Sequence, residues 1–507
     1  MAEAIRKIII AGGGTAGWMS AAALCVALPK TVEILLIESE DIGIIGVGEA
    51  TIPTMRVFND HIGVDEAEFI RATEASFKLG IEFVDWGHVG NRYFHAFGDF
   101  GARFEGLMPH QIWRKLREAG DTSSLEEQCL ATQLAYGGKF FPPNPDPRSP
   151  MHDYSYAFHF DAGLYAKFLR GHCEARGVKR RNARINGVNL RSDDGFVESL
   201  TLDDGSVETA DFFVDCTGFR GLLIEGALNS GYTDWSDYLP VDRAWAVPCA
   251  KAEPLTPYTR STAHAAGWQW RIPLQHRTGN GHVYSSRFME DDTARDILLR
   301  NLDGEVLKDP MLIRFQTGHR NTFWNKNCIC VGLSSGFLEP LESTSINFIQ
   351  VGIIRLLELF PSRACEPALV KEYNARTLES YERVRDFIIL HYRLNTRDEE
   401  MWRYTANMAI PDDLANKIEL YALRGEVVQR KYDHFAEPSW ISIYNGQGLV
   451  PQSYDPLADR VPDEELHRLT QQRRDSIRKV VQQLPDHAQF IAQHCASPSF
   501  LNAAKSA

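Results

Sequence analysis

The sequence predicts an α/β fold: a Rossmann-type dinucleotide-binding region with mixed sheets, followed by a mainly helical C-terminal region. Three observations support this class. A glycine-rich turn follows the first apolar strand, a second glycine- and serine-rich turn near residue 335 joins a strand to a long helix, and the pattern beyond residue 360 is mostly helical. We therefore expect domains at 1–360 and 361–507, with segments inserted into the first at about 55–150 and 222–325.

The first elements form a complete dinucleotide fingerprint. A short strand at 7–11 runs into a G-x-G-x-x-G turn, an Ala-rich helix follows at 18–28, and a second strand at 31–37 ends on Glu38. In such units the backbone N–H groups of the turn hold a pyrophosphate and the terminal acid binds ribose hydroxyls. The residues expected to hold a dinucleotide are therefore Glu38 and the turn residues Gly12, Gly13, Gly14, Thr15, Ala16 and Gly17.

The next segments are less specific. Residues 46–53 predict a stiff loop laid against the nucleotide, and residues 74–84 alternate between apolar and polar, which predicts a half-buried strand. From composition alone, Lys78 is then a solvent-facing lysine. Aromatic residues and histidines at 93–97 are either a ligand-binding wall or core, and five prolines at 137–150 predict a long irregular loop.

The middle of the chain returns to the nucleotide-binding region. A helix is expected at 156–176, followed by strands that Asp-Gly turns interrupt. The apolar strand 211–214 ends at Asp215, and Gly218 follows in a short polar turn. Residues 222–325 predict strands and loops, and they include Trp268-Gln-Trp270-Arg-Ile-Pro.

The second glycine-rich turn lies between an apolar strand at 328–331 and a helix that begins near Ile346. Glu342 therefore belongs to a strand-to-helix turn, with Ser343 as the expected N-cap. Unpaired N–H groups and a partial positive charge at such a helix end attract a small anion. Glu342 either complements the helix dipole or takes part in chemistry, and these residues alone leave both readings open.

Composition restricts the class of protein. The formal charge of −13 argues against a nucleic-acid partner, and no apolar run reaches the roughly 18 residues that a membrane span needs. The N-terminal apolar run leads into glycines and lacks the pattern of a signal peptide. Nine cysteines occur without a C-x-x-C pair, which argues against zinc or a disulfide framework. We expect a cytoplasmic enzyme that uses no metal.

Taken together, these motifs resemble the flavin-dependent halogenases of the tryptophan-halogenase type. The resemblance covers at least residues 7–360. It is carried by GGGTAGW near the start, GVGEATIP at 46–53, SFKLGI around Lys78, FHFDA at 158–162, W-x-W-x-I-P at 268–273 and GFLEPLESTSI at 336–346. The family implies an FAD-binding box like that of flavin monooxygenases and a smaller helical pyramid at the C-terminus.

The resemblance also implies a reaction. Reduced FAD and O2 oxidise bound bromide or chloride to hypohalous acid, which Lys78 activates and positions against an aromatic ring. Glu342 takes the proton that the ring loses or orients the oxidant. The halide site maps onto Thr344 and Ser345, in agreement with the helix N-terminus. A separate NAD(P)H-dependent flavin reductase is implied as partner, because the chain has one dinucleotide fingerprint.

The remaining roles also follow from the resemblance. Trp268 and Trp270 keep the flavin apart from the substrate, and His95, Phe97 and Phe435 surround the substrate ring. Besides the glycine turn and Glu38, the family implies FAD contacts at Ala50, Ile185, Asp215, Gly218, Ser334, Phe337, Leu338 and Ile346.

The substrate end departs from the family pattern. Members that take free tryptophan carry paired tyrosines and an acid for the amino group. Here Tyr421 stands alone in sequence, and Arg424, Arg430 and Lys431 occur where those residues are expected. An arginine cannot receive an ammonium group. We expect a small electron-rich aromatic of the indole type, or a larger or peptide-borne indole, with free tryptophan a poor substrate.

Two other readings remain. A flavin-dependent aromatic hydroxylase shares this fold, but such enzymes usually carry Gly-Asp where this chain has Gly332-Leu333-Ser334. A non-catalytic flavin-binding redox protein would retain flavin and give no halide-dependent product. Because a fold does not fix function, the choice depends on Lys78, Glu342 and the tryptophan motif.

Overall fold

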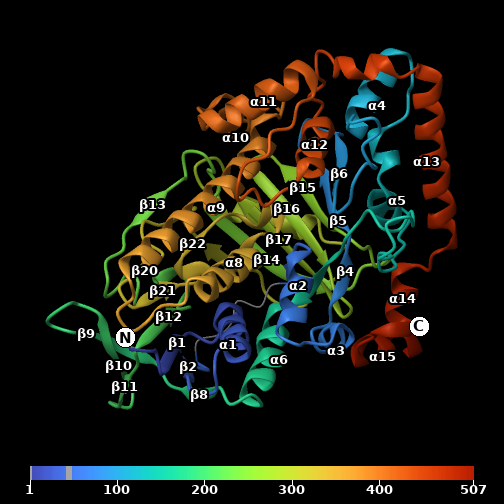
Figure 1. Ribbon diagram of the computed structural model, residues 1–507. Coiled ribbons are helices and arrows are strands. Elements are labelled where there is room, and N and C mark those ends of the chain that lie inside the picture. Colours follow the sequence, from blue (N-terminus) through green and yellow to red (C-terminus); the bar gives the residue numbers. More distant parts are fainter. Residues whose placement is uncertain (1–2, 42–47, 507) are drawn as a thin grey trace. The chain divides into compact units, whose positions relative to one another are not determined.

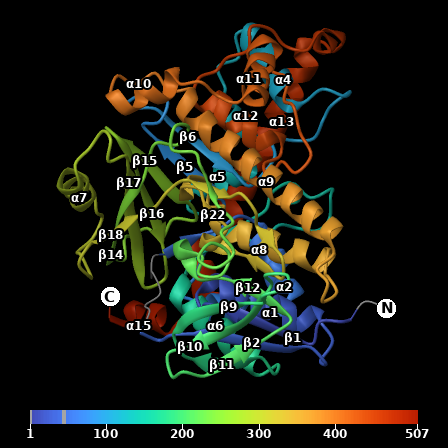
Figure 2. The ribbon, with the colours of Figure 1, turned by 90° about the vertical axis from the view of Figure 1, so that its left-hand side faces the viewer.

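The computed structural model describes residues 3–41 and 48–506, so Gly46 and Val47 of the expected nucleotide-side loop lie outside the described residues. The chain divides into two compact units, each built from three separate segments (Figures 1 and 2). The first unit comprises Met1–Ala75, Phe160–Asp242 and Arg314–Glu382, and the second comprises Ser76–His159, Arg243–Ile313 and Arg383–Ala507.

A largely parallel sheet organises the first unit. Its strand order is β20-β21-β12-β1-β2-β8, and every neighbouring pair from β21 to β8 is parallel, whereas β20 is antiparallel to β21. The central strand β1 (Lys7–Ala11) is apolar and almost wholly buried, as expected of a parallel strand covered on both faces. Helix α1 (Thr15–Ala27) packs against β1 and β2 and against α6 (Figure 1).

The chain reverses its winding direction between β1 and β12 (Phe212–Asp215). From β1 the chain proceeds to β2 and β8 on one side, and β12 and β21 lie on the other. Ala11 at the end of β1 pairs with Asp215 at the end of β12. In open α/β sheets, ligands bind beyond the carboxyl ends of the strands at this kind of switch point. Both expected nucleotide-binding turns follow these two strands directly.

The first unit contains two further three-stranded sheets, β11-β10-β9 and β13-β19-β22. Helix α9 (Pro367–Arg393) then leads into the second unit. The other elements of the first unit are β2 (Glu33–Glu38), β3 (Gly48–Ala50), α2 (Thr54–His61), α3 (Glu66–Ala72), α6 (Ala162–Glu174), β8 (Lys179–Asn182), β9 (Ile185–Leu190), β10 (Val197–Leu202), β11 (Val207–Thr209), β13 (Tyr232–Asp234), β19 (Gly318–Arg320), β20 (Trp324–Asn325), β21 (Cys328–Cys330), β22 (Gly336–Phe337) and α8 (Ser345–Glu358), with short 3-10 turns at Gly218–Arg220, Gly332–Ser334 and Pro340–Glu342.

A mostly antiparallel seven-stranded sheet organises the second unit, in the order β18-β14-β17-β16-β15-β5-β6. Helix α7 (Asp291–Arg300) packs on β14 and β17 of this sheet (Figure 2). The other elements are β4 (Ser76–Lys78), β5 (Gly80–Val84), β6 (Arg92–Ala96), α4 (Pro109–Glu118), α5 (Leu130–Tyr136), β7 (Ala157–Asp161), β14 (Arg243–Ala250), β15 (Thr259–His264), β16 (Gly267–Pro273), β17 (Arg277–Tyr284), β18 (Met311–Arg314), α10 (Glu400–Asn407), α11 (Asp412–Arg424), α12 (Glu437–Gly446), α13 (Asp463–Gln483), α14 (His487–His494) and α15 (Pro498–Ser506).

The expected half-buried strand at 74–84 is wrong in one respect: its polar face is buried too. Ser76, Lys78 and Glu82 are all 0% exposed. The Glu82 carboxylate is paired with the guanidinium groups of Arg92 and Arg260, so its burial is compensated by charge. An alternating pattern reports which side chains share a face, and it cannot show that partners cover the second face.

Three local expectations also need correction. Residues 157–161 form strand β7 and not the start of a helix, because Asp161 caps helix α6 by accepting from the Leu164 N–H at 3.0 Å. Helix α7 lies inside the region read as strands and loops. Ser343 is not the N-cap of α8: it has a left-handed φ of 58°, and Thr344 occupies the cap position.

No helix of the part of the chain that the structure describes is long and apolar enough to cross a membrane.

Candidate functional site

The glycine turn of the first unit has the shape of a nucleotide cradle. A Cβ at Gly12, whose φ is +105°, would lie 2.3 Å from the Cys216 carbonyl oxygen, and one at Gly17 would lie 1.9 Å from the Gly12 carbonyl oxygen. These two glycines allow close backbone packing. At Gly14 a Cβ would meet nothing within 4 Å, so the turn leaves open space at the start of α1. A pyrophosphate fits there, against the first N–H groups of the helix.

Glu38 lies beside this turn. It ends β2, and a Cβ at Gly13 would overlap the Glu38 carboxylate, so the two residues are in direct contact. The Arg180 guanidinium pairs with Glu38 and also with Glu40. The acid is therefore where the fingerprint places a ribose-binding carboxylate.

Asp215 holds the turn that follows β12 in place through hydrogen bonds. Its carboxylate accepts hydrogen bonds from the N–H groups of Thr217, Leu223 and Ile224, at 2.9 Å each, and from the Thr217 hydroxyl. Its carbonyl oxygen accepts from the Ser334 hydroxyl at 2.5 Å. Both side chains therefore shape backbone around the switch point.

The turn at Gly332–Ser334 lies next to the glycine turn at the start of α1. Gly332 has a φ of +75°, and a Cβ there would lie 2.8 Å from the Cβ of Ala16. The turn after β21 thus packs on the start of α1, which brings all three expected FAD segments of the first unit together. The other expected contacts lie in this unit at Ala50 in β3, Ile185 at the start of β9, Gly218 after β12, Phe337 in β22, Leu338 after it, and Ile346 in α8.

The start of α8 forms the expected halide region. Glu342 and Thr344 are each 1% exposed, and Ser345 is half-buried. Thr344 makes no side-chain capping bond, and within the described residues its buried hydroxyl oxygen has no hydrogen-bond partner. A helix of this length with an uncapped, buried start can bind a small anion.

Lys78 lies on β4 in the second unit, and a cluster of buried polar groups holds this strand at Ser76. The Ser76 hydroxyl donates to the Pro273 carbonyl oxygen at 2.5 Å, and it lies 3.1 Å from His159 Nδ1. His159 Nε2 lies 2.9 Å from the Thr259 hydroxyl. Because the Ser76 hydrogen is already used, Nδ1 donates to Ser76 and Nε2 accepts from Thr259. Burial, and then the Lys78 charge, lower the pKa of His159 well below its usual value, so it is neutral.

On the other face of β4, the side chain of Phe77 packs among aromatic rings. The Phe77 ring stacks on Phe140 with centroids 3.9 Å apart and meets Phe490 edge to face at 5.4 Å. The Phe77 N–H donates to His487 Nε2 at 3.1 Å. Both faces of the short strand are therefore fixed, and Lys78 has a defined position.

A run of rings begins at Lys78. Its ammonium nitrogen lies 5.2 Å from the Phe97 ring centroid, and the centroids of Phe97 and His95 are 6.4 Å apart. His95 lies 6.1 Å from Phe435, which stacks on Phe387 at 3.9 Å. The three expected pocket residues are thus brought together with Lys78. Sequence reasoning missed Phe387, because its place in the long helix α9 has an ordinary apolar pattern.

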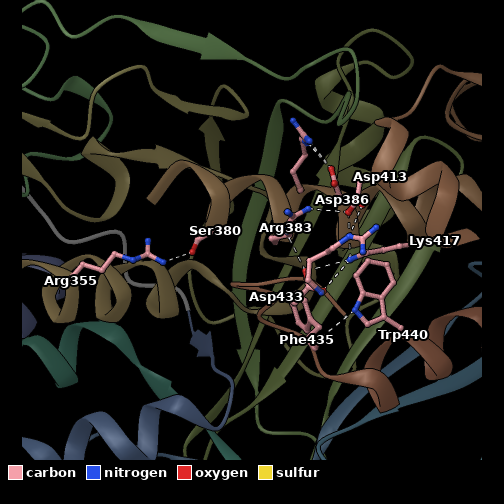
Figure 3. A network of polar contacts seen from close by, with 11 residues as sticks. Arg355, Ser380, Arg383, Asp386, Asp413, Lys417, Asp433, Phe435 and Trp440 are labelled. Carbon is pink, nitrogen blue, oxygen red and sulfur yellow. Dashed lines mark hydrogen bonds and ion pairs between the residues drawn. The ribbon is translucent and has the colours of Figure 1, made fainter. Parts of the chain in front are cut away.

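A charged network holds the segment that carries Phe435. The Lys417 ammonium group donates to Asp433 at 3.1 Å and lies 4.2 Å from the Trp440 ring centroid, and the Trp440 indole N–H donates to the Phe435 carbonyl oxygen at 3.2 Å (Figure 3). Asp413 lies next to this network. Lys417 and Asp433 are both buried, so the pair fixes the loop two residues before Phe435.

The expected basic residues at the substrate end are engaged elsewhere. Arg430 pairs with Asp413 at 2.9 Å, Arg424 lies 3.4 Å from Glu426, and the Lys431 ammonium lies 4.7 Å from the Tyr432 ring. Tyr421 is not alone in space, although it is in sequence: its ring stacks on Tyr444 at 4.1 Å. Tyr444 lies in helix α12, outside the local sequence around Tyr421, so the spacing near Tyr421 did not reveal the pair.

The tryptophan motif forms part of β16. Trp268 and Trp270 are buried, with ring centroids 6.1 Å apart. A Cβ at Gly281 of the neighbouring strand would lie 2.0 Å from the Trp270 ring, so a glycine there makes room for the indole. Pro273, at the end of the same strand, receives the Ser76 hydroxyl. The motif therefore connects to the Lys78 strand inside the second unit.

Among the described residues no group of three or more histidine, cysteine or carboxylate side chains could hold a metal ion.

Comparisons with known proteins agree with this arrangement. The family model described as tryptophan halogenase matches residues 7–463. The tryptophan 7-halogenase RebH of Lentzea aerocolonigenes is 33% identical over 532 residues, covering 97% of this chain and 99% of that protein. The tryptophan 6-halogenase SttH of Streptomyces toxytricini is 34% identical over 519 residues, covering 96% and 98%. The solved structure of the flavin-dependent halogenase BrvH from Brevundimonas sp. BAL3 has a TM-score of 0.94 and 46% identity, covering 97% and 99%.

Proposed function

The chain belongs to the tryptophan halogenase family, and on that premise we propose that it halogenates an electron-rich ring of the indole type, with Lys78 and Glu342 as catalytic residues. It is a flavin-dependent halogenase, an enzyme that uses FAD and a halide. The observation that carries the proposal is the run Lys78–Phe97–His95–Phe435, which sets a buried ammonium group beside a series of aromatic rings.

The residues present fit FAD. The open space at Gly14 would take the pyrophosphate, Glu38 the ribose, and the turns at Asp215 and Gly332 the rest of the cofactor. When bound in its reduced form, FAD supplies with O2 the oxidising equivalents that convert bromide or chloride to hypohalous acid. We assign these contacts to residues 1–360, and we assign the completion of the substrate side to the C-terminal residues 361–507. FAD reduction is assigned to a separate NAD(P)H-dependent reductase.

We assign halide binding, positioning of the halogen and removal of the ring proton to residues of the chain itself. Thr344 and Ser345 would hold the halide at the uncapped start of α8. The Lys78 ammonium would hold the electrophilic halogen in register with one ring carbon, and the Glu342 carboxylate would take the proton that this carbon loses. Trp268 and Trp270 would keep flavin and substrate apart.

The substrate proposal follows from the rings and from the missing amino-acid receptor. His95, Phe97 and Phe435, which neighbour one another, would offer aromatic faces on which an indole stacks. RebH and SttH are tryptophan halogenases. In this chain the basic residue Arg430, already paired with Asp413, stands where an acid would be needed for a free amino group. An indole without the amino-acid group should therefore react better than tryptophan.

A competition assay tests this. Equimolar indole and tryptophan are incubated with the enzyme, FAD, a flavin reductase, NADH and bromide, and brominated products are quantified by mass spectrometry. We expect bromoindole in excess of bromotryptophan by about tenfold or more. A His95→Ala variant, which shortens the ring wall, should lose both products. Preferential bromination of tryptophan would overturn the substrate proposal.

A further inference from the structure

Two cysteine thiols lie against each other where helices α1 and α6 of the first unit pack together. Cys25 lies in the last turn of α1, and Cys173 lies in the last turn of α6. The Cys173 thiol donates to the Trp18 carbonyl oxygen at 3.8 Å, and the Cys25 thiol donates to that of Ala22 at 3.3 Å. The two thiols are also hydrogen-bonded to each other. Because residues 18, 22 and 25 share one face of α1, both sulfur atoms lie on that face.

The surroundings distinguish Cys25 from other cysteines of the chain. The hydrogen bond from the Cys173 thiol, and then the charges of Lys30 and Arg176, lower the pKa of Cys25, and burial opposes them. The hydrogen bond with Cys25 raises the pKa of Cys173, so Cys173 keeps its proton when Cys25 loses one. A thiolate is the form of cysteine that attacks an oxidant. Burial raises the thiol pKa of Cys129, Cys216, Cys328, Cys330 and Cys365.

Cys25 is also the more accessible member of the pair. It is 7% exposed, whereas Cys173 is 0% exposed, and the next residue of α1, Val26, is 40% exposed. The Lys30 ammonium group donates to the Arg176 carbonyl oxygen at 3.3 Å, which joins the segments that follow the two helices. A small oxidant arriving from the surface therefore meets Cys25 first, and Cys173 lies behind it.

The chemistry of the family produces such an oxidant. The chain is a flavin-dependent halogenase, and reduced flavin that reacts with O2 without oxidising a halide gives hydrogen peroxide. Hydrogen peroxide converts a cysteine thiolate to a sulfenic acid. The nucleotide cradle lies at Thr15, the first residue of α1, and Cys25 follows about 15 Å further along this helix. Peroxide is thus formed near the thiol pair.

We propose that Cys25 and Cys173 form a redox modification site, at which hydrogen peroxide oxidises Cys25 and Cys173 then closes a reversible disulfide between α1 and α6. The Cys25 thiolate attacks one peroxide oxygen, the O–O bond breaks, and the hydroxide that leaves takes up a proton to become water. The Cys173 sulfur attacks the sulfenic acid of Cys25, the S–O bond breaks, and hydroxide leaves with the Cys173 proton as a second water. Two thiols and one peroxide give one disulfide and two waters. The inference depends neither on the indole substrate nor on Lys78.

The disulfide would act on the fold as well as on the two thiols. It would join residues about 150 apart in sequence, and a crosslink of this span restricts the unfolded chain and stabilises the folded one. It would also fix α1, the helix that begins at the nucleotide cradle, to α6. Both cysteines lie near helix ends, where the backbone can yield as the sulfur atoms approach.

Peptide mapping tests the site directly. The FAD-loaded enzyme receives one equivalent of hydrogen peroxide, the remaining thiols are alkylated, and the chain is digested without reductant for mass spectrometry. The main oxidised product should be the peptide pair joined through Cys25 and Cys173, and dithiothreitol should restore both thiols. Oxidation distributed over the other cysteines, or Cys25 oxidised to sulfinic acid without a crosslink, would overturn the proposal.

Cys173→Ser removes the second thiol and keeps a small hydrogen-bond donor. Oxidation of this variant should stop at the sulfenic acid of Cys25, which dimedone labels, and no crosslink should form. Cys365→Ser is the matched control, because Cys365 is buried too and its thiol pKa is raised. This control should form the crosslink as the wild type does. A Cys173→Ser chain whose Cys25 takes up no dimedone would show that Cys25 is not the first thiol to react.

Urea denaturation measures the effect of the bond on the fold. Crosslinked wild type should unfold at a higher urea concentration than the reduced enzyme, and peroxide should leave the midpoint of Cys173→Ser unchanged. Equal midpoints before and after complete crosslinking would contradict a bond that stabilises the packing of α1 on α6.

Turnover tests the source of the oxidant. Enzyme incubated with FAD, flavin reductase, NADH and O2, without halide, should accumulate the same crosslink, and catalase should prevent it. A crosslink that forms with added peroxide but not under these conditions would overturn the assignment of the oxidant to the flavin reaction. A chain that forms the crosslink but brominates no indole would refute the proposed function and keep the thiol site.

Discussion

At the scale of single residues, the burial of Lys78 strengthens the electrostatic interactions that its charge can make. An ammonium group in water is screened, whereas at 0% exposure the Lys78 ammonium group would act on a bound halogen at a much lower effective dielectric. The β4 strand presents it rigidly, since Ser76 and Phe77 are both held by neighbours.

Lys78→Ala should abolish halogenation and leave flavin binding intact, because Lys78 lies on β4 and the glycine turn on a different element in the other unit. Lys78→Met, which keeps most of the side-chain volume, should behave in the same way and controls for a packing defect. Product formation and flavin fluorescence quenching are the measurements. Retention of even a tenth of the wild-type activity would show that Lys78 has no catalytic role.

Glu342→Gln should lower kcat by on the order of 100-fold or more if the carboxylate takes the ring proton. The amide has the same shape, so the fold should survive and flavin affinity should not change. Single-turnover assays with preformed hypobromite isolate the ring step, and an unchanged rate in that assay would leave Glu342 with a structural role.

Bromide should bind at the start of α8, near the backbone N–H groups of Thr344 and Ser345. A crystal soaked in bromide gives anomalous peaks that locate the ion without any turnover. Peaks confined to other parts of the molecule would contradict this site.

The sequence could predict which residue types are present at the site, but not all their surroundings. Lys78 and Glu342 were assigned through motifs shared with the family, whereas composition alone made Lys78 solvent-facing. Its burial depends on residues such as His159 and Thr259, which are distant in sequence and contact the strand only after folding. Phe387 escaped prediction for the same reason, since its stacking on Phe435 joins helix α9 to a loop.

At the scale of elements, β4 depends on a neutral histidine of helix α14. His487 Nε2 accepts from the Phe77 N–H, and Nδ1 donates to the Leu255 carbonyl oxygen at 3.0 Å. Burial lowers the pKa of His487 to about 4. A protonated ring could no longer accept at Nε2, so acid should loosen the strand that carries Lys78.

The sign of the pH effect follows from linkage. An unfolded histidine has a pKa of about 6.5, so the unfolded chain binds more protons between pH 6.5 and 4. The stability from neutral His487 is therefore complete above pH 6.5 and is lost as the pH falls towards 4, by about 3 kcal/mol. Chemical denaturation at pH 7 and pH 5 should show a smaller acid loss in His487→Gln than in wild type. An identical loss in both would contradict the role of His487.

Elements with a strong local pattern were predicted well, and those decided by one polar contact were not. The first strand, the helix after the glycine turn, α8 and α13 all carry clear periodicity. Residues 157–160 were taken for helix because Asp161 was not recognised as the cap that starts one. Ser343 was taken for a cap because serine favours that position, but the turn needs a left-handed residue there.

At the scale of the whole molecule, the enzyme should need electrons from another protein. The chain has one dinucleotide fingerprint, and its three turns converge on a single cradle in the first unit. NADH and FAD alone should therefore give negligible product, and added flavin reductase should restore it. Oxygen-electrode assays of NADH oxidation provide the check, and robust oxidation by the purified chain would contradict the expectation.

The fold class and family were predictable from the glycine turns and the tryptophan motif, which are local in sequence. The interleaving of two compact units was not, because it depends on contacts between segments more than a hundred residues apart, such as the pairing of β5 with β15. Sequence patterns indicated insertions into a nucleotide-binding region, but they could not show which insertions pack with the C-terminal helices.

This interleaving has a consequence for synthesis on the ribosome. The first unit requires residues up to Glu382, whereas the second takes its last segment from Arg383–Ala507. Domains made as a chain emerges generally fold as units, with the earlier one first. The flavin-side unit can thus complete itself while the segment Arg383–Ala507 is still being translated, and the segments Ser76–His159 and Arg243–Ile313 remain without their last packing partner until that segment has emerged.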